Sequence, residues 1–102
     1  MKTLFDEHAL ARIIEQSLVY QCACPAQVSR AVLELRDLHR YQLNCANEST
    51  NDRLVHETIA QAALDAHARL ETCLTQVLEL EGWDLDTMTM PDTLKKRPAK
   101  PW

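Results

Sequence analysis

The stretch from Asp52 to Glu81 decides the fold, and it reads DRLVHETIAQAALDAHARLETCLTQVLELE. It contains no proline and no glycine, and it stops at Gly82, the only glycine in the chain. A glycine directly after a run of helix-forming residues is the usual signal for a helix C-terminus. The sequence therefore predicts one long helix over 52–81.

Apolar residues of this stretch fall into two rows at helical spacing. The first row consists of Val55, Ile59, Ala62, Ala66, Leu70, Cys73, Val77 and Leu80. The second row consists of Ala60, Ala63, Leu74 and Leu78. Two rows imply contacts on two sides, and the alanines permit close approach of another helix. We therefore expect a homodimer built on this helix, with the second row among the residues that bind the partner.

Two shorter helices are expected before this stretch, over 4–21 and 25–46. Thr3 with Asp6 three residues later resembles a capping box, and Pro25 suits the first turn of a helix. Ser49 or Asn51 in the polar turn 47–51 can cap the third helix. Short connections make neighbouring helices antiparallel, so the expected fold class is all-α. The expected architecture is an up-down-up three-helix bundle over 1–82 with an overlong third helix.

Beyond Gly82 the chain changes character. Residues 83–102 are expected to form an extended tail, and its first half should pack on the bundle because it carries several large apolar side chains. The last eight residues are basic and proline-rich, and we expect them to be mobile. Trp102 is a candidate for docking on a protein partner. The alternative is that Trp102 covers an apolar edge of its own subunit or is disordered.

The chain of 102 residues has a net charge of −4, which is unevenly distributed. Residues 1–82 carry seven Lys or Arg against twelve Asp or Glu, and residues 83–102 carry four against three. An acidic body argues against nucleic-acid binding, which needs a basic face. No apolar run is long enough for a membrane span, and the N-terminus does not read as a secretory signal. Four cysteines without such a signal indicate the reducing cytoplasm.

The cysteines suggest one metal or redox hypothesis. Cys22 and Cys24 lie at the turn between the first two helices, and Cys73 lies where the returning helix reaches the same level. These three thiols could converge on zinc or another soft metal, although a structural zinc site wants four ligands. Cys45 lies a helix length away, and only an antiparallel partner could bring it to that trio. The alternative interpretation is ordinary packing of small apolar side chains, with no cofactor.

The histidines suggest a second, weaker hypothesis of a metal or ligand site. His39 and Gln42 interrupt the apolar side of the second helix and should lie level with His56 of the third. Metal binding by His39 and His56, a hydrogen-bonded network, and a ligand groove that also includes Tyr41 are the open interpretations. His67 and Glu71, one turn apart, are expected to form a surface ion pair.

A single glycine leaves no loop for cradling phosphate, and no nucleophile motif is present, so we do not expect an enzyme. The leading functional hypothesis is a small helical protein that acts by association, as a homodimer and as an adaptor or regulator of a protein partner. The alternative is a metal- or redox-sensing bundle that uses Cys22, Cys24 and Cys73.

Overall fold

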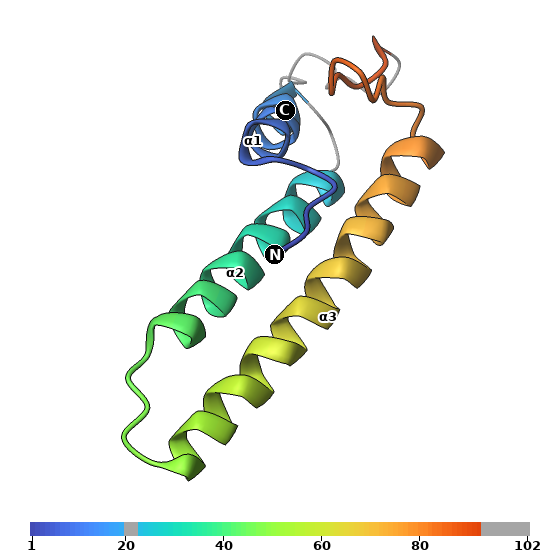
Figure 1. Ribbon diagram of the computed structural model, residues 1–102. Helices are drawn as coiled ribbons and strands as arrows, with labels where there is room; N and C mark the ends of the chain where they lie inside the picture. The colour runs from blue at the N-terminus through green and yellow to red at the C-terminus, as the bar shows by residue number, and fades with distance from the viewer. Residues whose placement is uncertain (20–22, 93–102) are drawn as a thin grey trace, which may run out of the picture.

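The computed structural model describes residues 1–19 and 23–92, and the fold is all-α (Figure 1). Its helices are α1 (Glu7–Gln16), α2 (Cys24–Asn44) and α3 (Thr50–Leu80), with a short 3-10 helix η1 (Ser17–Val19) after α1. Helices α2 and α3 form a long antiparallel hairpin, and α1 lies against the end that holds the start of α2 (Figure 1). The molecule is elongated, with dimensions of 60 × 32 × 18 Å.

Both ends of α3 are fixed by local hydrogen bonds. At the start, the Ser49 side chain accepts from a backbone N–H of the first turn at 3.1 Å. At the other end Gly82 has a φ of 75°, which favours glycine, and its N–H donates to Glu79 O at 3.1 Å. Trp83 N–H donates to Leu78 O at 3.0 Å, which completes a Schellman motif. The stop at Gly82 is confirmed.

Helix α1 is shorter than the sequence predicts. Its N-cap is Asp6, whose side chain accepts from Ala9 N–H at 2.7 Å, so the expected start at residue 4 with Thr3 as the capping residue is wrong. Leu4 and Phe5 precede the helix, and their N–H groups bond to Glu71 of α3. With only ten residues, α1 cannot run beside the whole hairpin.

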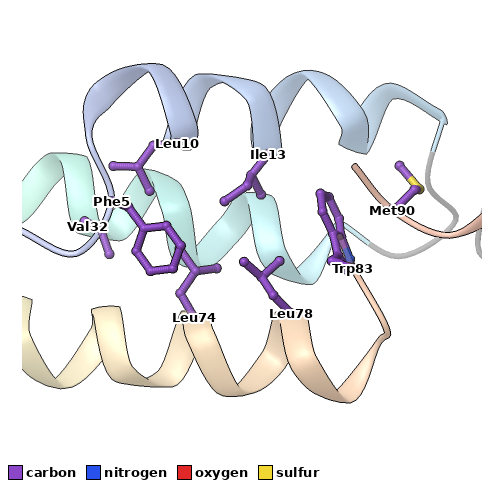
Figure 2. Close-up of a cluster of buried hydrophobic side chains, with 8 residues drawn as sticks. All are labelled: Phe5, Leu10, Ile13, Val32, Leu74, Leu78, Trp83 and Met90. Carbon is purple, nitrogen blue, oxygen red and sulfur yellow. The ribbon is translucent and has the colours of Figure 1, made fainter. Parts of the chain in front are cut away.

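The hydrophobic core lies at the end of the hairpin that α1 covers. Its buried cluster consists of Phe5, Leu10, Ile13, Val32, Leu74, Leu78, Trp83 and Met90 (Figure 2). Trp83 and Met90 come from the segment after α3, which turns back through paired backbone bonds between Asp84 and Thr89 at 2.9 and 3.3 Å. Towards the loop that joins α2 to α3, the hairpin continues as two helices without α1 (Figure 1).

The second apolar row of α3 lies inside this fold. Ala60, Ala63, Leu74 and Leu78 have exposed fractions of 8, 2, 0 and 0%. The assignment of these four residues to partner binding is therefore wrong, because α2 and the core cluster already cover them. The first row is the one that remains partly or fully exposed.

In the part of the chain that the structure describes, the search for a helix with the length and apolarity of a membrane span found none.

Candidate functional site

Three polar side chains form a buried cluster between α2 and α3. They are Arg36 from α2 and His67 and Glu71 from α3, with exposed fractions of only 7, 1 and 2%. The sequence predicted a surface ion pair for His67 and Glu71, and this prediction is wrong, since both side chains are interior. Charged groups removed from water are costly unless every one is paired, so the contacts of this buried polar cluster decide its role.

The Glu71 carboxylate ties the N-terminal segment to both long helices. Its Oε2 accepts from Leu4 N–H at 2.8 Å, from Phe5 N–H at 3.0 Å and from Arg36 Nη2 at 3.1 Å. The same Nη2 donates to the carbonyl oxygen of Phe5. Glu71 and Arg36 together therefore bind both N–H groups and one carbonyl oxygen of the two residues that precede the N-cap of α1.

His67 completes the cluster as an uncharged acceptor. Arg36 Nε donates to His67 Nε2 at 2.9 Å, and His67 Nδ1 lies 3.5 Å from Glu71 Oε1. An imidazole nitrogen that accepts a hydrogen bond carries no proton, so this network assigns the proton to Nδ1. The arrangement requires neutral His67 beside the charged Arg36 and Glu71.

Burial is the largest influence on His67, and it lowers the pKa of the imidazole below its ordinary value. Glu71 acts in the opposite direction and raises this pKa, whereas Arg36, His39 and the N-terminal ammonium group lower it further. A proton added to Nε2 would meet the Nε–H of Arg36, so the charged imidazole cannot keep the same contact.

This environment predicts that the protein loses stability as the pH falls. The ordinary pKa of histidine is about 6.5, and the folded-state value is lower, so below pH 6.5 the unfolded chain binds more protons at His67. The stability that rests on neutral His67 is fully present above that pH and is lost as the pH falls through the folded-state pKa. Urea unfolding between about pH 5 and 7 measures this dependence.

His67→Gln is the matched variant, because its amide oxygen can still accept from Arg36 Nε and does not titrate. We expect the free energy of unfolding of this variant to change less steeply with pH than that of the wild type. Equal slopes for the two proteins would show that the other histidines cause the pH dependence.

The buried polar cluster fixes the N-terminal segment relative to the hairpin. By holding Leu4 and Phe5, it places α1 on one side of the hairpin. At about 100° per residue, the members of the first row lie between about 80° and 160° around the helix axis from Leu78. Leu70, the member nearest to Leu78 in angle, packs against the core cluster.

We call this first row the outer row. It contains Val55, Ile59, Ala62, Ala66, Leu70, Cys73, Val77 and Leu80. Leu80 is 86% exposed and Val55 47%, and both alanines are exposed as well. On α2, Ala31, Leu35, Leu38, Gln42 and Cys45 recur at helical spacing, and we call the four apolar ones among them the α2 row. We call the outer row and the α2 row together the uncovered face, after its exposed members, which are Leu38, Val55, Ala62, Ala66 and Leu80.

The thiol sites are only partly described. Cys24 is exposed and Cys73 is half-buried, whereas Cys22 lies outside the described residues. Trp102 also lies outside them. Within residues 1–19 and 23–92, no group of three or more His, Cys, Asp or Glu is placed to hold a metal ion. The metal or redox hypothesis stays a prediction.

The other histidine candidates share a groove between α2 and α3. His39, Gln42 and His56 all line it, and its volume is about 500 Å³, whereas Tyr41 is not among its lining residues. His56 Nδ1 lies 2.7 Å from Asn47 Oδ1, so its orientation is explained by a protein contact. Gln42 Oε1 is buried without a hydrogen-bond partner among the described atoms.

The fold and these contacts define a class of protein: a small all-α protein built on a two-helix hairpin, with one face covered by α1 and one uncovered. Comparison with protein families, curated proteins and solved structures found no match for this chain. Sequence reasoning missed Arg36 as a site residue. The spacing of Arg36 indicates that it lies on the buried side of α2, because it follows the buried residues Ser29 and Val32 by seven and four positions.

Proposed function

We propose that the protein acts by association, and that two copies pair through the uncovered face to form a four-helix core. The observation that carries this proposal is the outer row, which extends over most of α3 at helical spacing. Val55, Ala62, Ala66 and Leu80 of this row are exposed, whereas its other members are half-buried and Leu70 packs against the core cluster. Exposed apolar positions that recur along one side of a helix are typical of an association surface.

The size of the face supports a second copy as its occupant. The outer row spans 25 residues from Val55 to Leu80. With about 1.5 Å of rise per residue, the outer row is about 37 Å long and the α2 row, from Ala31 to Cys45, about 21 Å long, so with helices each about 10 Å wide the face measures on the order of 600 Å². A stable interface buries about 800 Å² on each partner, so the face supplies roughly three quarters of the size that a dimer needs.

The chemistry of the face supports the same occupant. Burying a charge against an apolar surface is costly, and the members of the outer row and the α2 row are all apolar, with Asp65 and Arg69 flanking the outer row. Two identical faces of this kind are therefore mutually compatible. A role as an adaptor through residues 95–102 and Trp102 stays a separate prediction, because that segment lies outside the described residues.

Ala66→Glu tests this proposal, because it places a carboxylate in the centre of the outer row. Ala66 is exposed in the single chain and glutamate favours helix, so the fold should be retained. We expect sedimentation equilibrium at micromolar concentration to give a dimer for the wild type and a monomer for Ala66→Glu, with equal helical circular dichroism.

Ala68→Glu is the matched control. Ala68 is also an exposed alanine of α3, but it lies on another side of the helix, outside the outer row. We expect this variant to remain a dimer. A wild-type protein that is monomeric at about 100 μM, or an Ala66→Glu variant that dimerises like the wild type, would overturn the proposal.

A further inference from the structure

We infer that the two copies pair with α3 antiparallel to the partner's α3, about a two-fold axis next to Ala66, and that Asp65 of each copy faces Arg69 of the other. This inference rests on the proposed function and adds the orientation and register of the partner. It identifies Asp65 and Arg69 as the residues that specify the dimer.

The outer row is self-complementary in this orientation. Ala62 and Ala66 lie near its middle, where two helices related by a two-fold axis approach most closely and need small side chains. Val55 and Leu80 lie at its two ends and are brought level with each other in the antiparallel pair. Both of these end residues are well exposed in the single chain, at 47 and 86%.

The charged residues beside the outer row define the register of the two α3 helices. An axis about midway between Val55 and Leu80 makes Asp65 of one helix level with Arg69 of the other, and the symmetry repeats the pair. Both residues are exposed and flank the outer row on the side away from α2. Asp65 accepts from Gln61 Nε2 at 3.0 Å through one oxygen, which leaves its other oxygen available. No hydrogen bond or ion pair with a described residue engages Arg69.

A second two-fold arrangement of the same faces predicts different neighbours. If α3 packed against the partner's α2, antiparallel and with the two hairpin loops at the same end, Arg69 would be level with Glu34 of α2. The observed exposure favours the first arrangement. Four of the eight members of the outer row are exposed, whereas Leu38 is the one exposed member of the α2 row.

Charge reversal tests the register with the full-length protein. Asp65→Arg alone places two arginines opposite each other at both symmetry-related positions, and Arg69→Asp alone places two aspartates there. We expect each variant to dimerise roughly tenfold more weakly than the wild type at low salt, as measured by the dissociation constant from sedimentation. An equimolar mixture of the two variants should form a heterodimer about as tight as the wild type, because every facing pair is then complementary.

Cross-linking gives an independent measurement. In a background with all four native cysteines changed to serine, Ala66→Cys should form a disulfide-linked dimer on mild oxidation, because the two thiols lie beside the axis. Val55→Cys in the same background should not.

The outcomes separate this inference from the proposed function. A monomeric wild type would overturn both. The wild type could instead form a dimer while the mixture of the two variants fails to regain wild-type affinity. If the single-chain double variant Glu34→Arg with Arg69→Glu then regains that affinity, the α3 pairing is overturned and self-association remains. Absence of the Ala66→Cys cross-link in a dimer would also overturn the register.

Discussion

Glu71→Ala is expected to lower the free energy of unfolding by about 3–5 kcal/mol, because it leaves a buried guanidinium without its counter-charge. The same change removes the acceptor of the Leu4 and Phe5 N–H groups, which are bonded to Oε2 at 2.8 and 3.0 Å. A domain of this size has a total stability of about 5–15 kcal/mol, so the loss is a large part of it. Urea unfolding followed by circular dichroism at a fixed protein concentration measures the change.

Two further variants show whether the unpaired charge is the cause. Arg36→Met combined with Glu71→Gln removes both charges and keeps an amide oxygen to accept from the N-terminal backbone. We expect this double variant to regain a substantial part of the lost stability, since replacing a buried ion pair by neutral groups is often close to neutral. Glu79→Ala, an exposed position on the same helix, should stay within about 0.5 kcal/mol of the wild type. A loss below about 1 kcal/mol for Glu71→Ala would contradict the role of the cluster.

The sequence contains a pattern that indicates buried polar groups at this place in α3, although these groups were not assigned to the interior from the sequence alone. The second apolar row of α3 breaks off after Ala63 and resumes at Leu74, and the two positions that continue its spacing are His67 and Glu71. A polar pair that fills a gap in an apolar row indicates buried polar groups with partners. The pattern within one helix cannot show which residue of another helix satisfies them, and this is why Arg36 was missed.

The start of α1 shows a second limit of local pattern. Thr3 and Asp6 have the spacing of a capping box, and nothing in residues 1–10 opposes a helix from residue 4. The contacts that fix this segment come from Glu71, more than sixty residues away, which accepts from the Leu4 and Phe5 amides and cannot be read from the local pattern. The long helix was predicted more accurately, because its cap at Ser49 and its stop at Gly82 are properties of adjacent residues.

The two rows of α3 were found from periodicity, but their roles were exchanged. Periodicity defines which residues share a side of a helix and says nothing about which side the neighbouring helix takes. In the structure the shorter row meets α2 and the core cluster, because Phe5 and α1 are held on that side by Glu71 and Arg36. The longer row keeps four exposed members, and the homodimer that we propose uses this row instead of the shorter one.

Ala62→Glu and Ala63→Glu, at adjacent positions of α3, should therefore have opposite effects. Ala63 is 2% exposed at the contact between α2 and α3. A glutamate there must both fit a larger side chain into a close contact and bury a carboxylate, so we expect a loss of at least about 3 kcal/mol and a chain that is largely unfolded near 37 °C. Thermal unfolding by circular dichroism measures this loss.

Ala62→Glu is the control at the neighbouring position. Ala62 is exposed in the single chain and belongs to the outer row, so a glutamate there should leave the helical content of the monomer intact and abolish the dimer. Both variants should be compared in the Ala66→Glu background, in which association no longer contributes to the apparent stability. In that background Ala62→Glu should melt close to its parent, whereas Ala63→Glu should melt far below it. Equal melting temperatures for the pair would mean that the two sides of α3 have been assigned wrongly.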